Sequence, residues 1–149
     1  MVCVTQQRKV QIWIGCRDQG IHYFLIFKTV PQRGSFWQPV TGHVEVGESD
    51  QEAALRELKE ETGYTVDELI KIGEVEPSNG CMRNPTHIYL SFVSEQGEQQ
   101  LDETELIEVV YRRPDEVDQM VERNDIWDSL TISAWAMARP RILHTEPYV

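Results

Sequence analysis

Residues 42–64 read GHVEVGESDQEAALRELKEETGY, and this stretch predicts the best-defined element of the chain, a helix over Asp50–Thr62. Ser49 followed by Glu52 is typical of a helix N-terminus, where a side-chain oxygen caps the first free N–H groups. Gly63 stands where a helix commonly ends in the left-handed conformation. Most residues between these two signals are good helix formers. We therefore expect a regular helix that begins after the serine and ends at the glycine.

Three glutamates of this helix are expected to share one face. Glu57, Glu60 and Glu61 stand at positions i, i+3 and i+4, which places their side chains within roughly 100° of the helix circumference. Leu55 and Leu58 lie on another face, which would be buried against a sheet. Like charges at this spacing repel one another, so the stripe indicates a cation site. Carboxylates without nearby histidine or thiolate suit a hard ion such as Mg²⁺ or Mn²⁺, and a solvated acidic face is the alternative.

The whole stretch resembles the Nudix box, in which a Gly, five residues, a Glu and seven residues precede Arg-Glu-aliphatic-any-Glu-Glu-any-Gly-aliphatic. The positions that fit, without a gap, are Gly42, Glu48, Arg56, Glu57, Leu58, Glu60, Glu61 and Gly63. Tyr64 departs from the usual Ile, Leu or Val, although an aromatic ring can fill an apolar position. The resemblance implies the Nudix fold, an α+β domain whose mixed sheet is sandwiched between helices (α/β/α).

The resemblance also implies a hydrolase of nucleoside diphosphate compounds that uses Mg²⁺ or Mn²⁺. Glu57, Glu60 and Glu61 then correspond to the metal-binding glutamates, and either Glu57 or Glu60 to the base that activates water. Arg56 corresponds to the arginine that holds these carboxylates in position, a role suited to bidentate guanidinium geometry. The loop at Gly42 would lie closest to the metal, with its backbone carbonyl as a further ligand.

Two flanking segments bear on the substrate. Residues 36–42, FWQPVTG, are similar to a segment of the dihydroneopterin triphosphate pyrophosphatases, which also act on dATP and related nucleoside triphosphates. Residues 102–105, DETE, are similar to a Thr-Glu pair of that subgroup, so Glu105 is expected as a further metal ligand, with Glu103 as the competing choice. Candidate substrate contacts are Lys28, Arg33, Trp37, Gln38 and Arg83. For Trp37 the favoured alternative is a place in the hydrophobic core. For Arg33 and Arg83 it is a solvent-exposed side chain without a role in binding.

The favoured function is hydrolysis of a purine or pterin nucleoside triphosphate to monophosphate and pyrophosphate by water attack at phosphorus. An RNA 5′-end pyrophosphohydrolase, or a hydrolase of dinucleoside polyphosphates or nucleoside diphosphate sugars, is the alternative. Such RNA and dinucleotide hydrolases usually carry a WQFPxGG segment and a basic surface, and this chain has neither. A nucleotide-sensing module without turnover is the third hypothesis, against which the intact set of box glutamates counts.

Composition limits the partners and the compartment. The 149 residues suit a single domain, residues 1–149, and 14 Lys and Arg against 25 Asp and Glu give a net charge of −11. That balance disfavours binding to a DNA or RNA duplex or to an anionic membrane, because such partners need a positive surface. The longest apolar run, Ile21–Phe27, is far shorter than the ~20 residues that span a bilayer. Three cysteines without CxxC spacing favour the cytoplasm.

The rest of the chain predicts strands first and helices last. A hairpin is expected from Val10–Ile14 and Ile21–Phe27, because turn-forming residues separate two β-branched and aromatic runs. The further strands expected are Ile70–Val75, His87–Val93 and Leu106–Tyr111, and the further helices Pro114–Val121 and Ser129–Ala138, the last ending before Pro140. Trp127 and Trp135 are expected in the core. An edge strand or the long loop Glu76–Thr86 could serve a homodimer.

Overall fold

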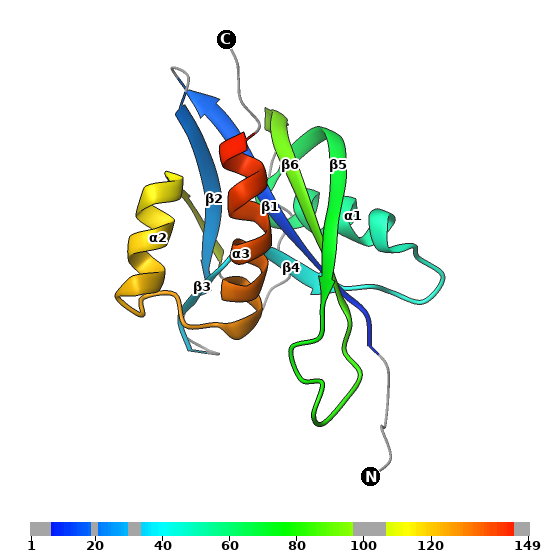
Figure 1. Cartoon of the computed structure of the whole chain (residues 1–149). Helices are drawn as coiled ribbons and strands as arrows, with labels where there is room; N and C mark the ends of the chain where they lie inside the picture. The colour runs from blue at the N-terminus through cyan, green and yellow to red at the C-terminus, as the bar shows by residue number, and fades with distance from the viewer. Residues whose placement is uncertain (1–6, 19–20, 30–33, 97–106, 145–149) are drawn as a thin grey trace.

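The computed structural model describes residues 7–18, 21–29, 34–96 and 107–144, and within these ranges the chain has an α+β fold. Strands come first, a helix interrupts them, and two helices close the chain (Figure 1). The elements are β1 (Lys9–Asp18), β2 (Ile21–Thr29), β3 (Phe36–Gln38), β4 (Val40–His43), α1 (Asp50–Thr62), β5 (Tyr64–Val75), β6 (Thr86–Gln96), β7 (Ile107–Arg112), α2 (Pro114–Glu122) and α3 (Ser129–His144).

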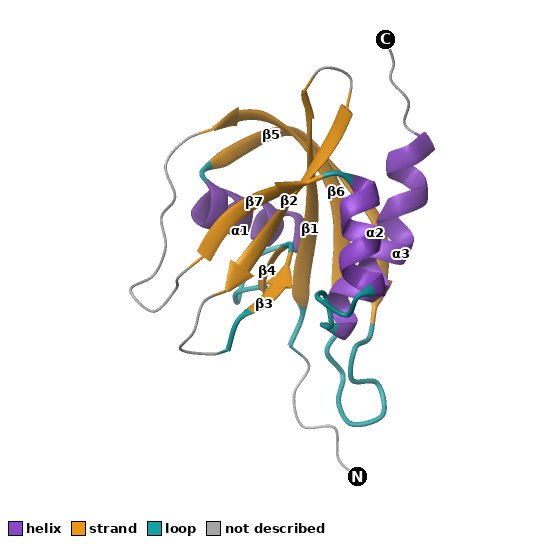
Figure 2. Ribbon diagram, turned by 90° about the vertical axis from the view of Figure 1, so that its left-hand side faces the viewer, coloured by secondary structure: helices purple, strands orange, loops and turns teal. Residues whose placement is uncertain are grey.

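A mixed sheet forms the middle layer of the described part. Its order is β3-β2-β1-β6-β5, with β4 paired to β1 and β7 paired to β2. The strands β1 and β6 run parallel and the other pairs are antiparallel, including the predicted hairpin of β1 and β2. Helix α1 covers one face of the sheet, while α2 and α3 cover the other (Figure 2). The predicted α/β/α layering is confirmed.

Side chains of β1 alternate between two hydrophobic cores, one on each face of the sheet. Val10, Ile12 and Ile14 pack toward α1, in the core that also holds Leu58. Trp13 packs toward α2 and α3, where its ring centre lies 5.0 Å from that of Trp135. This alternation is the period-two pattern of a strand with both faces covered. Trp135 is therefore a core residue, as expected.

Helix α1 has the predicted ends, but its buried arc is shifted. The Ser49 hydroxyl oxygen accepts a hydrogen bond from the N–H of Glu52 at 3.1 Å, and Gly63 ends the helix with φ 77°. Leu58 is buried as expected, whereas Leu55 is 42% exposed, so its predicted burial is wrong. At 100° per residue, Leu55 lies at the flank of the arc that faces the sheet, and Glu61 lies near the centre of that arc.

Two predicted boundaries are each wrong by six residues, because tertiary packing overrides local signals. Strand β5 begins at Tyr64, directly after α1, and not at Ile70. Its pairing with β6 shifts register at three places, and such bulges hide the alternating pattern from the sequence. Helix α3 continues through Pro140 to His144, because the buried side chain of Ile142 anchors the last turn in the core. Pro140 has no N–H to donate to the carbonyl of Ala136, and because both residues are exposed, water can hydrate that carbonyl.

Trp127 lies in the loop between α2 and α3 and is 56% exposed, so its predicted place in the core is wrong. The neighbouring Ile126 is fully buried and fills that part of the core instead. In the described residues, none of the helices is both long and apolar enough to cross a membrane.

Candidate active site

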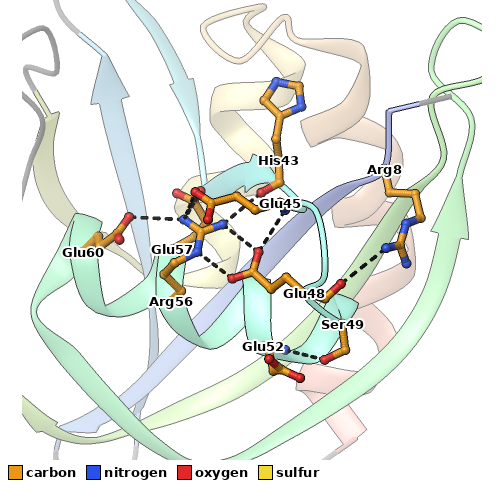
Figure 3. A network of polar contacts seen from close by, with 9 residues as sticks. All are labelled: Arg8, His43, Glu45, Glu48, Ser49, Glu52, Arg56, Glu57 and Glu60. Carbon is orange, nitrogen blue, oxygen red and sulfur yellow. Dashed lines mark hydrogen bonds and ion pairs between the residues drawn. The ribbon is translucent and has the colours of Figure 1, made fainter. Parts of the chain in front are cut away.

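The guanidinium of Arg56 connects the loop before α1 to the carboxylates of the helix (Figure 3). Its Nε and Nη2 donate to the two carboxylate oxygens of Glu48 at 2.7 and 3.0 Å. Its Nη1 donates to Glu57 Oε1 at 2.8 Å and to Glu60 Oε2 at 3.3 Å. Its Nη2 also donates to the backbone carbonyl of His43 at 3.0 Å. Arg56 thus holds two glutamates of its own helix and two points of the preceding loop in one arrangement.

Glu48 is fixed from both sides of its carboxylate. Besides the bidentate contact with Arg56, it accepts a hydrogen bond from the N–H of Glu45 at 3.0 Å. The hydrogen bond from Arg56 is the main reason why the pKa of Glu48 falls from 4.5 to about 2. In turn, the Glu48 carboxylate raises the pKa of Arg56 above its usual range. Both groups are therefore charged at neutral pH.

This pair gives stability a defined pH dependence. Because the pKa of Glu48 is depressed on folding, its contribution is fully present above pH 4.5 and is lost as pH falls toward about 2. We expect the free energy of unfolding, measured by urea titration at several pH values, to fall across that window. The variant Glu48→Gln should be less stable at pH 7 and should show a flatter decline between pH 4.5 and 2. An equally steep acid decline in this variant would assign the loss to other carboxyl groups.

An open pocket of about 320 Å³ lies where the end of β4 and the loop after it meet α1. Glu57 and Glu61 of α1 belong to its lining, together with Gly42 of β4. Glu61 is only 5% exposed, because it occupies the sheet-facing arc of the helix. The full lining is Lys9, Gln38, Thr41, Gly42, His43, Glu45, Glu57 and Glu61. The structure thus brings the predicted residues Gly42, Glu57 and Glu61 together.

The donor set of this pocket fits a hard divalent cation. Carboxylate oxygens of Glu57 and Glu61, with the backbone carbonyl of Gly42, are the oxygen ligands that Mg²⁺ or Mn²⁺ prefers. Glu60 is not part of this lining, and its carboxylate is directed to Arg56 (Figure 3). Among the described residues, His, Cys, Asp and Glu side chains form no ready cluster of three or more. Two of the three predicted glutamates therefore line the pocket, and the third contacts the arginine.

Gly42 and the side chain of Glu57 pack so closely that a Cβ atom at residue 42 would overlap the Glu57 carboxyl group. We expect Gly42→Ala to displace this carboxylate and to lower kcat by about 100-fold, since misplacement of a reacting group by about 1 Å costs that much. Gly80→Ala is the matched control, because a Cβ there would meet open space. Steady-state kinetics of both variants test this, and equal activity of the two would contradict the close packing.

Of the predicted substrate-binding residues that the structure describes, only Gln38 belongs to the lining of the pocket. Trp37 packs against the core on the α2 and α3 side, with the Arg112 guanidinium 5.5 Å from its ring centre. Lys28 lies opposite Trp37 in the pairing of β2 with β3. Arg83 pairs with Glu76 at 3.1 Å in the loop between β5 and β6 and does not line the pocket. Arg33, Glu103 and Glu105 lie outside the described residues.

Sequence reasoning missed several residues that line the pocket. Lys9 pairs with His43 across β1 and β4, and it therefore belongs to the lining of the pocket although it stands 48 residues before Glu57. Thr41 is oriented by the fully buried Gln11, whose amide nitrogen donates to its hydroxyl at 3.2 Å. Partial burial, and next the charge of Lys9, lower the pKa of His43. A lysine at the start of a strand has no local sequence pattern that predicts its place in the lining of this pocket.

The comparisons with known proteins agree with this geometry. The family model that describes the NUDIX domain matches residues 6–134. An ADP-ribose pyrophosphatase of Bacillus subtilis (strain 168) is 37% identical over 97 residues, which is 62% of this chain and 51% of that protein. The chain therefore spans about half the length of this relative.

Solved structures show the same fold at low sequence identity. A crystal structure of an ADP compounds hydrolase has a TM-score of 0.77 and 20% identity, covering 93% of this chain and 74% of that one. The NUDIX domain of Shewanella oneidensis NrtR, complexed with ADP ribose, has a TM-score of 0.73 and 17% identity, covering 93% of this chain and 90% of that one.

Proposed function

The chain belongs to the NUDIX family, and on that premise we propose that it hydrolyses a phosphoric anhydride bond of a nucleotide with the help of Mg²⁺ or Mn²⁺. The observation that carries the proposal is the pocket in which Glu57, Glu61 and the Gly42 loop are gathered. Glu57 and Glu61, with the Gly42 carbonyl, would hold the cation. A divalent cation bound there neutralises charge on the phosphate oxygens and polarises the attacking water.

The chain's own residues would divide the remaining tasks. Glu57 is proposed as the base that takes a proton from water, in preference to Glu60, because Glu57 lines the pocket and Glu60 does not. Arg56 keeps the Glu57 carboxylate in position through its hydrogen bond at 2.8 Å. Lys9 brings a positive charge to a lining with three glutamates, and its ammonium group would contact a phosphate of the substrate. The water oxygen would bond to phosphorus and give its proton to Glu57 while the anhydride P–O bond breaks, and the leaving group would be pyrophosphate for a triphosphate or a phosphomonoester for ADP-ribose.

Two substrate classes follow from two observations. The segment FWQPVTG over residues 36–42, whose Gln38 and Thr41 line the pocket, favours a purine or pterin nucleoside triphosphate. The identity of 37% to an ADP-ribose pyrophosphatase favours ADP-ribose. Substrates of both classes carry at least two phosphates joined by an anhydride bond, attached to a nucleoside or to a pterin. The same cation site would therefore serve both classes. We propose the triphosphate as the first candidate and ADP-ribose as the second.

A product analysis by anion exchange distinguishes these candidates. The purified chain is incubated with Mg²⁺, and in parallel with Mn²⁺, and one of the common nucleoside triphosphates, dihydroneopterin triphosphate, ADP-ribose, diadenosine tetraphosphate or a 5′-triphosphorylated RNA. Monophosphate and pyrophosphate from one triphosphate would support the first candidate, and AMP with ribose 5-phosphate the second. Cleavage of only the RNA or the dinucleotide would contradict both candidates and favour an RNA 5′-end or dinucleoside polyphosphate hydrolase. No turnover with either metal would favour a nucleotide-sensing module.

A further inference from the structure

Thr41 lines the pocket with a hydroxyl group whose only hydrogen is already used. Thr41 Oγ1 donates to the backbone carbonyl oxygen of Pro39 at 3.0 Å. Because a carbonyl oxygen can only accept, the hydroxyl hydrogen must lie in this contact. The side-chain amide of Gln11 therefore meets the hydroxyl as a donor, with its Nε2 at 3.2 Å from Thr41 Oγ1. Toward a ligand in the pocket, Thr41 can consequently act only as an acceptor.

The burial of Gln11 is a second and independent observation at this place. Gln11 is fully buried, and in the described part of the chain its Oε1 has no hydrogen-bond partner. An amide oxygen that loses its water without gaining another donor destabilises the folded state. An apolar side chain of similar size would avoid this cost. What the buried amide does achieve is to hold the Thr41 hydroxyl, which indicates a role at the pocket.

Thr41 lies on the face of the sheet that points away from the candidate cation site. Gln11 shares its face of β1 with Trp13, which packs toward α2 and α3 (Figure 2). Thr41 is the register partner of Gln11 and is bonded to it, so both side chains lie on that face. Gly42, the next residue of β4, packs instead against Glu57 of α1.

This placement limits the ligand group that Thr41 can meet. Ionised phosphate oxygens only accept hydrogen bonds, so they cannot pair with an acceptor. A cation beside Glu57 would hold its waters on the α1 side of the sheet. The donor must therefore belong to the organic part of the nucleotide.

We propose that Thr41 accepts a hydrogen bond from the exocyclic amino group of the substrate's heterocycle, and that Gln11 fixes the hydroxyl for this contact. The proposal rests on the proposed function and adds to it a specificity-determining residue, Thr41, and a positioning residue, Gln11. Adenine, guanine and pterin all carry an amino group at the ring edge, so one acceptor suits both substrate candidates. Hypoxanthine is guanine without this group, and its nucleotides should therefore bind less well.

Isothermal titration with monophosphates that differ in one amino group tests the contact. GMP carries the group and IMP lacks it, and AMP with purine riboside 5′-monophosphate forms the second pair; all are titrated with Mg²⁺. In the pair that binds more tightly, we expect the wild type to favour the amino nucleotide about tenfold, the effect of one neutral hydrogen bond. Thr41→Val should reduce this ratio to about twofold or less, whereas Thr41→Ser, which keeps the hydroxyl, should retain it.

Thr86→Val is the matched control for the loss of the hydroxyl. Thr86 is a buried strand threonine whose hydroxyl also donates to a carbonyl two residues earlier, that of Asn84 at 3.4 Å, but it does not line the pocket. We expect this variant to keep the wild-type ratio. Equal binding of the paired nucleotides by the wild type, an unchanged ratio in Thr41→Val, the same loss in Thr86→Val, or no binding of either amino nucleotide would overturn the proposal.

Gln11→Met separates positioning from a purely structural role. Methionine has almost the size of glutamine but cannot hold the hydroxyl, so the ratio should fall to about threefold. Because the unpartnered Oε1 leaves the core with this change, the Tm should stay within about 4 °C of the wild type or rise. A larger fall in Tm with an unchanged ratio would make Gln11 a structural residue and overturn its positioning role.

Two further comparisons keep the outcomes distinguishable. If Thr41→Val abolishes a preference for GMP over its 2′-deoxy form and leaves the ratio of GMP to IMP unchanged, the hydroxyl contacts the sugar and the amino-group proposal is overturned. With GTP and ITP, or ATP and purine riboside 5′-triphosphate, as substrates, the selectivity should appear in KM. Turnover without selectivity would overturn the amino-group contact and leave the hydrolase standing. Selective binding that depends on Thr41, in a chain that hydrolyses nothing, would support the contact and remove the hydrolase.

Discussion

Replacing Glu61 by Gln should lower kcat for the preferred nucleotide by on the order of 1000-fold while the fold stays intact. Glu61 is 5% exposed and lines the pocket beside Glu57 and Gly42. The amide has almost the volume of the carboxylate but no negative charge, so it cannot balance the charge of a divalent cation. Because the cation would neutralise the phosphates, its loss affects the chemical step itself and not only substrate binding.

The matched control is Glu52→Gln, the same chemical change in the exposed first turn of the same helix. We expect this variant to retain wild-type kcat. Thermal unfolding of both variants should stay within about 4 °C of the wild type, which corresponds to roughly 1 kcal/mol or a little more for a chain of this size. Binding of Mn²⁺, followed by electron paramagnetic resonance, should weaken in Glu61→Gln alone. Undiminished turnover in Glu61→Gln would refute the assignment of the site.

Replacing Arg56 by Lys should lower both activity and stability, although the charge is kept. The guanidinium contacts Glu48, Glu57, Glu60 and the His43 carbonyl together, and an ammonium group cannot match this planar geometry. We expect kcat/KM to fall by about 10- to 100-fold, as for other residues that orient metal ligands. The free energy of unfolding should fall by about 2 kcal/mol, because hydrogen bonds to charged groups are lost in a half-buried place.

Arg83→Lys is the control for this change. Arg83 also pairs with a glutamate, but its side chain is 62% exposed and lies outside the lining of the pocket. An exposed pair of this kind contributes less than about 1 kcal/mol, so kinetics and urea unfolding should match the wild type. If Arg56→Lys behaves like this control, the network around Arg56 is not what positions Glu57.

Local patterns in the sequence predict much of the structure correctly. The capping residues Ser49 and Gly63 act within a few positions of the helix they limit, and both ends of α1 are as predicted. The hairpin of β1 and β2 depends on neighbouring segments and is also correct. The predictions fail where packing partners are distant in sequence, as for Leu55 at the flank of the buried arc and Trp127 beside the buried Ile126.

What the sequence by itself determined is the family and the carboxylates of the candidate cation site, which follow from short spacings within residues 42–64, and the layered α+β fold, which follows from the order of its elements. Tertiary structure alone decided which groups share the pocket. The pairing of β1 with β4 brings Lys9 to Glu57 and Glu61, and the return of the chain after α2 places Trp127 against Phe36. These neighbours are separated by tens of residues, so their contact depends on strand register and helix packing that no local pattern encodes.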